Sequence, residues 1–381
     1  MLERIQPLNR LVNEMLDKFP DSDWNDESVV WLDPAMGGGQ FVKECEDRLQ
    51  RRGLSNADIF RRVIGFEYSL ALVDLAVNMH KLVGNYQKVP YKKYFSSSIS
   101  ELGLDKSMKF NIVGNPPYNS SSGGPHGTGG DNILYRRFSD KSLEIVAKTG
   151  GVCALVNLKG IIRYLENKKT DKDYVESHGL KNIDYINLMT DGDWKYDTCY
   201  FVIDTKSTKD TTQFDASDRI VTNMFSTVDN FKYVLVDGVA NPNPKRNCSR
   251  QKVSGIINHK SDTISPTYGD IDSGAAIYGP KLISNLYGRK SSWHVTADPS
   301  CIGGYTFLFD TVENADKFKL FLGNNKGLEY FREKMNEQKG VVKVCRYLKK
   351  FDLSQITTGY EYPKEWNLTP EDIKKIEETI K

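Results

Sequence analysis

Short apolar runs alternate with amphipathic segments over the first 204 residues, and this alternation restricts the fold more than any other feature of the chain. Buried strands are predicted at Val29–Leu32, Val63–Phe66 and Phe110–Val113, which are almost wholly apolar. Between them, Gln40–Arg52 and Leu70–Val83 carry apolar residues at helical spacing. Strands that alternate with helices predict a doubly wound, mostly parallel α/β sheet, which binds ligands beyond the carboxyl ends of its strands. The same pattern predicts a helix at Asn132–Lys148 and strands at Gly151–Asn157, Ile183–Leu188 and Cys199–Ile203.

The composition predicts a folded, soluble chain with neither a metal site nor a membrane span. Of the 381 residues, 39% are hydrophobic and 27% are charged, so we expect a packed core. The 6 cysteines form no CxxC pair, which argues against structural zinc and against a disulfide scaffold. No apolar run approaches the ~20 residues that span a bilayer, and the first residues lack a signal-peptide core. We therefore expect an intracellular protein.

A polar segment without periodicity, Ser207–Asp218, predicts a boundary between two domains, residues 1–210 and residues 211–381. Beyond it come short apolar pieces and turns rich in glycine and proline. A helical stretch follows at Val312–Met335 and breaks near Gly323–Lys326. This pattern predicts a mixed α+β second domain.

The net charge of +2 conceals two basic stretches in the second domain. Residues 241–260 hold five basic side chains and no acid, and residues 336–350 hold five basic side chains and one acid. Such stretches can pair with phosphates, although ordinary solvated surface explains either one equally well. The first stretch lies between turn formers and predicts a protruding loop, so it supplies the candidate DNA contacts Lys245, Arg246, Arg250 and Lys252.

A glycine loop follows the first predicted strand. The segment Asp33–Phe41 reads DPAMGGGQF and joins that strand to a helix. Its glycines allow a ligand to approach the backbone closely, next to unpaired N–H groups at the helix start. Neither GxGxxG nor a P-loop is present, so a purely structural turn remains an alternative. Glu67 ends the second strand, 34 residues after Asp33, and either accepts from a ribose diol or begins a surface helix.

The third feature is Asn115-Pro116-Pro117-Tyr118, which directly follows the strand Phe110–Val113 and Gly114. The prolines stiffen the turn and lack backbone donors, so carbonyl groups remain as its polar groups. The Asn115 side-chain oxygen and the Pro116 carbonyl can both accept from one planar amine, which activates its nitrogen for attack on a sulfonium methyl group. Tyr118 offers a ring on which a base can stack.

Taken in order, residues 33–41, Glu67 and residues 115–118 resemble the S-adenosylmethionine-dependent DNA adenine-N6 methyltransferases. The order is that of the gamma class, in which the cofactor loop comes first, NPPY follows and the target-recognition domain is last. The resemblance is strong over about residues 28–204 and loose beyond them. It implies a Rossmann-like methyltransferase sheet with a C-terminal target-recognition domain, S-adenosylmethionine as cofactor and double-stranded DNA as partner. It leaves a cognate restriction endonuclease open, and it implies a cytoplasmic, nucleoid-associated enzyme that flips its target adenine.

The resemblance also implies roles for single residues. The loop from Asp33 to Gly39 would line the methionine moiety of the cofactor, and Glu67 would hold its ribose hydroxyls. Trp194 is preferred to Tyr196 as a second aromatic ring against the base, although either could be core. The implied catalytic residues are Asn115, Pro116, Pro117, Tyr118 and Trp194, and the implied cofactor contacts are Asp33, Ala35, Gly37, Gly39, Phe41, Glu67, Tyr68 and Asn115.

The chain departs from the family near the third strand, where residues 91–98 lack the expected acid and Phe95 is the substitute contact for the cofactor's adenine. The same NPPY chemistry could also act on an RNA adenine or on a protein glutamine amide. A catalytically inactive specificity module is a further alternative. The ~170 residues beyond the predicted boundary and their basic stretches favour DNA.

Overall fold

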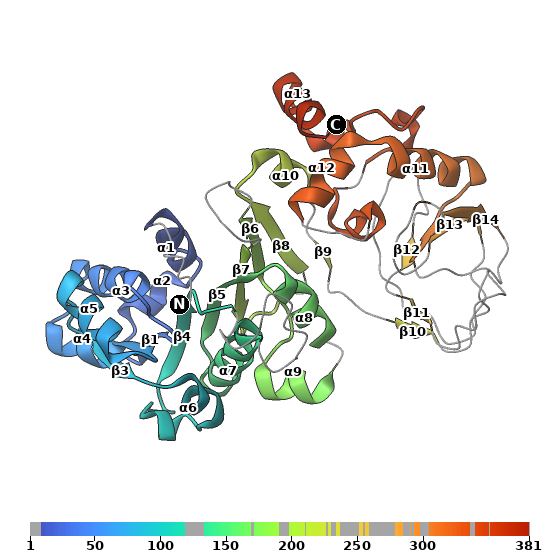
Figure 1. Cartoon of the computed structure of the whole chain (residues 1–381). Coiled ribbons are helices and arrows are strands. Elements are labelled where there is room, and N and C mark those ends of the chain that lie inside the picture. Colours follow the sequence, from blue (N-terminus) through green and yellow to red (C-terminus); the bar gives the residue numbers. More distant parts are fainter. Residues whose placement is uncertain are drawn as a thin grey trace. The chain divides into compact units, whose positions relative to one another are not determined.

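The computed structural model describes residues 9–118, 133–168, 171–189, 198–209, 211–225, 228–229, 234–236, 251–253, 256–258, 279–284, 290, 293–297, 305–335, 340–349 and 351–380. The chain divides into two units (Figure 1). Unit 1 comprises Met1–Asn187 and Tyr196–Lys209, and unit 2 comprises Leu188–Lys195 and Asp210–Lys381.

Unit 1 is built on a twisted sheet with the strand order β3-β2-β1-β4-β5-β7-β6. Its strands are β1 (Val29–Asp33), β2 (Val63–Glu67), β3 (Asn85–Lys88), β4 (Lys109–Gly114), β5 (Val152–Leu158), β6 (Tyr185–Met189) and β7 (Thr198–Asp204). β1 pairs in parallel with β2 and β4, β2 with β3, and β4 with β5, whereas β7 runs antiparallel to β5. The predicted doubly wound, mostly parallel, Rossmann-like sheet is confirmed. The order reverses between β1 and β4, which is where such sheets bind ligands.

Burial explains why these segments form strands. Every residue of β1 and β2 is buried, as in strands that are covered on both faces. The helix α3 (Gln40–Arg51) packs on β1 and β2, α5 (Leu70–His80) packs on β2 and β3, and α7 (Leu134–Thr149) packs on β4 and β5. These three helices agree with the predicted ones to within a few residues. β3 escaped prediction because its sequence, NYQK, has no apolar run and lies at the sheet edge.

Several short elements of unit 1 also escaped prediction, because three to nine residues show too little periodicity. They are α1 (Asn9–Leu16), α2 (Asp21–Asn25), α4 (Asn56–Arg62), α6 (Tyr91–Ser96), α8 (Gly160–Lys168), α9 (Lys172–His178) and the 3-10 turn Ser100–Leu102. Helix α4 begins with a capping box, in which Ser55 and Asp58 each bond the other's backbone N–H.

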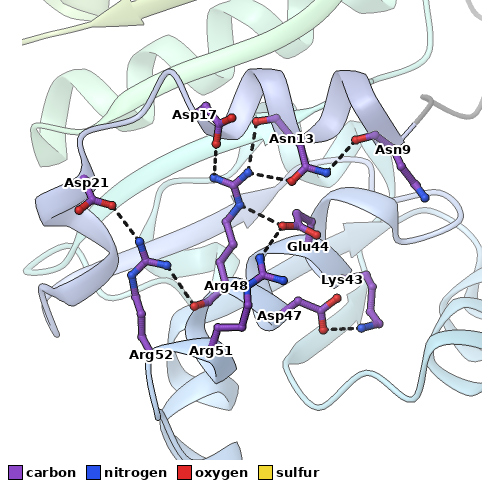
Figure 2. Close-up of polar contacts among 10 residues, drawn as sticks. All are labelled: Asn9, Asn13, Asp17, Asp21, Lys43, Glu44, Asp47, Arg48, Arg51 and Arg52. Carbon is purple, nitrogen blue, oxygen red and sulfur yellow. Dashed lines mark hydrogen bonds and ion pairs between the residues drawn. The ribbon is translucent and has the colours of Figure 1, made fainter.

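Ion pairs connect α3 to α2 and to Asp17, the residue after α1 (Figure 2). Three arginines at the C-terminal end of α3 each pair with a carboxylate, namely Arg48, Arg51 and the C-cap residue Arg52. Arg48 pairs with Asp17 and Glu44, Arg51 pairs with Glu44, and Arg52 pairs with Asp21. The positive charge of each of these three arginines is therefore balanced by a nearby carboxylate.

Unit 2 mixes small sheets with helices. An antiparallel pair joins β8 (Thr211–Ala216) to β9 (Val228–Asp229), and another joins β10 (Val234–Val236) to β11 (Gln251–Val253). A further sheet has the order β12-β15-β13-β14, with β12 (Ile256–Asn258), β13 (Lys281–Ser284), β14 (His294–Thr296) and β15 (Tyr305–Leu308). The helices are α10 (Arg219–Met224), α11 (Val312–Asn324), α12 (Lys326–Lys334) and α13 (Pro370–Thr379), and 3-10 turns lie at Val341–Lys343, Cys345–Tyr347, Leu353–Gln355 and Lys364–Trp366.

The helical stretch of unit 2 breaks where the sequence predicts. α11 ends at Asn324 and α12 begins at Lys326, because the Asn325 side chain accepts the N–H of Leu328 at 2.9 Å and caps the second helix. The rings of Phe318, Phe321, Phe351 and Trp366 form the core beneath it. None of the helices in the described ranges has the length and apolar character that a bilayer crossing requires.

Candidate functional site

The glycine loop lies at the carboxyl end of β1 and leads into α3. Gly37 and Gly39 have φ angles of 53° and 83°, a left-handed conformation that other residues rarely adopt. A Cβ on Gly39 would lie 3.2 Å from the Cβ of Ala76 on α5, so the loop packs tightly there. The Met36 N–H donates to the Phe66 carbonyl at 2.8 Å. This bond fastens the loop to β2, the strand that carries Glu67.

Glu67 is buried, with 2% of its surface exposed, and points to the glycine loop. Its Oε2 accepts the Gly37 N–H at 3.0 Å, and its Oε1 accepts the N–H groups of Tyr68 and Ser69 at 2.9 and 3.3 Å. This geometry excludes the interpretation of Glu67 as an exposed residue at the start of a surface helix. These bonds hold the Glu67 carboxylate beside the glycine loop.

Asp33 is the second buried carboxylate of the site, with 2% exposed. Burial raises its pKa to about 8; the Ala35 N–H, which donates to Asp33 Oδ1 at 2.9 Å, opposes this rise, and the charge of Glu67 adds to it. Gly114, at the end of β4, lies against this carboxylate, because a Cβ there would be 2.7 Å from Asp33 Oδ1. The glycine therefore allows β4 to deliver the following residue close to Asp33.

That following residue is Asn115, which opens the NPPY turn. The Tyr118 hydroxyl donates to Asn115 Oδ1 at 3.0 Å and thereby orients the amide. The Tyr118 carbonyl accepts the N–H of Tyr135 in α7 at 3.3 Å, which anchors the far end of the turn. Pro116 is buried, whereas Asn115, Pro117 and Tyr118 are half-buried. Asp33, Glu67 and Asn115 thus stand at the carboxyl ends of three neighbouring strands, β1, β2 and β4.

An aromatic cluster continues the site beyond β2 and β3. The ring of Tyr68, 37% exposed, lies 5.1 Å from that of Tyr91, and Tyr91 lies 5.2 Å from Phe138 of α7. Phe95 packs on Phe138 at 4.9 Å. The third strand of the chain, β3, ends at Lys88, and residues 91–96 after it form α6. Tyr91 was not among the residues predicted for the site, because no bounds were predicted for β3, the strand that precedes it.

The remaining predicted residues are placed as follows. Ala35 is buried in the glycine loop and Phe41 is buried in α3. Trp194 lies outside the described residues, as do Tyr196, Lys245, Arg246 and Arg250. Lys252 lies in β11, where it pairs with Leu235 of β10, so at this position the structure has a strand and the predicted loop is wrong.

In the part of the chain that the structure describes, no group of three or more His, Cys, Asp or Glu side chains is placed to bind a metal ion. Four of the cysteines, Cys45, Cys153, Cys199 and Cys345, are buried free thiols. Burial raises the pKa of each thiol. They are therefore protonated core residues, not nucleophiles.

Protein-family models and curated proteins give no match to the sequence. Among solved structures, the chain is similar to a type I restriction-modification methyltransferase subunit from Streptococcus thermophilus, at 14% identity and a TM-score of 0.40, over 60% of this chain and 49% of that one. It is similar to the M protein of the type I restriction enzyme EcoKI at 15% identity and a TM-score of 0.37, over 55% and 45%. It is also similar to the DNA-bound type ISP enzyme LlaBIII at 14% and 0.39, over 57% and 20%. Each match spans less than half of the other protein, and the fold assignment rests on the strand order of this chain itself.

Proposed function

We propose that this protein transfers a methyl group from S-adenosylmethionine to the N6 amine of a flipped adenine in double-stranded DNA. One observation carries the proposal: Asp33, Glu67 and the NPPY turn meet at the carboxyl ends of adjacent strands, at the point where the strand order reverses. A cofactor held by the two carboxylates would lie beside the Asn115 amide. The substrate amine and the methyl donor would then be neighbours.

The residues of the loop fit this cofactor. Glu67 supplies a buried acceptor for the ribose hydroxyls, and Tyr68 and Tyr91 supply rings beside it for the adenine. Asp33 would contact the ammonium group at the methionine end of the cofactor. A cation beside this buried carboxyl group would favour its ionised form and so oppose the effect of burial. When bound, S-adenosylmethionine supplies an electrophilic methyl group. Ala35, Gly37, Gly39 and Phe41 shape the loop.

The NPPY residues would act on the substrate amine. The Asn115 oxygen and the Pro116 carbonyl accept its two hydrogens and favour a tetrahedral, nucleophilic nitrogen. Tyr118 orients the Asn115 amide and offers a ring for the base, opposite Trp194 in this proposal. Pro117 stiffens the turn, so the acceptors are already positioned before the base arrives.

Unit 2 would read the duplex, because a base inside a duplex cannot be reached until the DNA is held and the base is flipped. In this proposal Lys245, Arg246, Arg250 and Lys252 supply contacts to DNA. A partner endonuclease would recognise the same DNA sequence, which the methyl group would protect.

The test is to express the chain in a host that lacks adenine methylation and to sequence the host DNA with detection of N6-methyladenine. We expect methylation at one sequence motif for the wild type and none for Asn115→Ala. The matched control is Asn13→Ala, on α1, which should methylate normally. If wild-type DNA carries no modified adenine while the purified protein binds S-adenosylmethionine, DNA is not the substrate, and RNA and protein amides become the candidates.

A further inference from the structure

Two adjacent arginines, Arg136 and Arg137, lie in the first turn of α7, the next helix in the chain after the NPPY turn that the structure describes, and both lie on aromatic rings. The guanidinium carbon of Arg136 is 4.9 Å from the ring centroid of Tyr164 in α8. That of Arg137 is 4.3 Å from the ring centroid of Phe95 in α6. A guanidinium group over an aromatic ring is attracted to the face of that ring, and this contact restricts the arginine side chain before any ligand binds. Neither arginine has a role in the methyl transfer described above.

Neither arginine has a carboxylate partner among the described residues. On a helix the natural partner of Arg136 is Asp140, four residues on. The Asp140 carboxylate instead accepts the hydroxyl groups of Tyr164, at 2.8 Å, and Tyr174. Arg136 Nε is buried, and no group in the described ranges accepts its hydrogen. The Asp140 oxygens thus bond two tyrosine hydroxyls and form no ion pair with Arg136.

Arg137 is exposed, and the residue four positions after it is the cation Lys141, not an acid. Lys141, four residues on, donates to the Ser97 carbonyl at 2.7 Å and pairs with Glu144 at 3.0 Å. The arginines of α3 differ, since each of them pairs with a carboxylate (Figure 2). Within the described ranges, Arg136 and Arg137 are therefore two positive charges that lie on aromatic rings and form no ion pair, and such an arrangement can bind an external anion.

The two charges flank the candidate site. Tyr135, the residue before Arg136, donates its N–H to the Tyr118 carbonyl of the NPPY turn. Phe95, beneath Arg137, belongs to the aromatic cluster that leads through Tyr91 to Tyr68. An anion bound by the arginines would thus lie near the NPPY turn and this aromatic cluster. In the proposed function the carboxylate of S-adenosylmethionine lies with its methionine end at the glycine loop, so a phosphate of the substrate is the anion left for this pair.

We propose that Arg136 and Arg137 bind backbone phosphates of the nucleic acid next to the flipped base. A planar guanidinium group matches a phosphate with two parallel hydrogen bonds, and phosphate contacts position a nucleic acid without reading its sequence. This inference rests on the proposed function. It adds phosphate contacts from unit 1 to the contacts that the sequence predicts in unit 2, at Lys245, Arg246, Arg250 and Lys252.

The experiment is a sodium chloride titration of the binding of the full chain to a fluorescein-labelled duplex of mixed sequence. Each phosphate contact contributes about 0.9 to the slope of log affinity against log salt, so the double variant Arg136→Gln and Arg137→Gln should lose ~1.8. The double lysine variant keeps the charges and should retain most of the slope. Arg51→Gln is the matched control, because Arg51 is an exposed helical arginine whose charge Glu44 already compensates.

Calorimetry with S-adenosylmethionine shows in parallel whether each variant is folded. If the double variant misfolds, the single variant Arg137→Gln, which changes an exposed residue, replaces it in the titration. A double glutamine variant that binds the cofactor and keeps the wild-type slope overturns the inference. If the wild type also methylates host DNA, the proposed function survives that result. A wild type that binds duplex with a slope dependent on both arginines, but leaves host DNA unmodified, supports the phosphate contacts and overturns the methylation of DNA.

Discussion

Replacing Asp33 with asparagine should stabilise the folded protein, and the gain should increase with pH. The two side chains have nearly the same shape, and an asparagine oxygen can still accept the Ala35 N–H that now donates to Asp33 at 2.9 Å. Only the ionisation of the buried carboxyl group is removed. The variant therefore isolates the energetic cost of holding this carboxyl group at the end of β1.

The magnitude follows from the pKa of Asp33, which is 3.8 without burial and about 8 in the folded protein. Between these values the folded state holds a proton that the unfolded state has released, so the free energy of unfolding falls as pH rises through the window. Each pH unit is worth about 1.4 kcal/mol, so the wild type loses up to ~6 kcal/mol across the window. The Asp33→Asn variant lacks this loss, and its advantage should level off above pH 8.

The assay is urea unfolding of both proteins at a series of pH values that spans the window. The difference in unfolding free energy should rise by about 1.4 kcal/mol per pH unit and then reach a plateau. Asp21→Asn is the control, because the Asp21 side chain is 86% exposed, and its difference from the wild type should stay nearly constant. A constant difference for Asp33→Asn as well would refute the reasoning that burial dominates at this carboxyl group.

Three further perturbations test the site. Asn115→Ala should leave the affinity for S-adenosylmethionine nearly unchanged and lower the rate of methyl transfer by about 10²–10³, measured in single-turnover assays, and wild-type turnover would reject its role. Glu67→Gln keeps the side-chain size but removes the charged acceptor, so calorimetry should show cofactor binding weakened by ~1.5–3 kcal/mol, whereas unchanged affinity would remove Glu67 from the cofactor site. Gly114→Ala would place a Cβ 2.7 Å from Asp33 Oδ1, so urea unfolding should show a loss of ~1–3 kcal/mol, and a neutral result would mean that β4 can move away from Asp33.

Local patterns were sufficient to predict the main strands and the two motifs. The unbroken burial of β1 and β2 appears in the sequence as uninterrupted apolar runs, and the break at Asn325 appears as a polar interruption of a helical pattern. The glycine loop and the NPPY turn are recognisable because glycine and proline restrict the backbone by themselves, whatever their surroundings. These features depend on residues within a few positions of one another.

Short or polar elements could not be predicted in this way. β3 and α6 have 4 and 6 residues, which is too few to show a period, and they form because β2 and Phe138 offer them partners. This also limited the prediction of the site, because the contact between Tyr91 and Tyr68 depends on the position of β3. Lys252 is a similar case, because its strand exists only through pairing with β10.

The sequence by itself determined which chemical groups this protein has and at which strand ends they stand, because that information is local. Only the tertiary structure decided what each group meets. Glu67 became a loop-bound carboxylate because β2 lies beside β1, which brings the Gly37 N–H within 3.0 Å across 30 residues of chain. Asp140 forms no ion pair with Arg136, because α8 and α9 bring two tyrosine hydroxyls to its oxygens. Such contacts depend on which strands and helices become neighbours, and that arrangement is set by the packing of the whole unit and not by the spacing of residues along the chain.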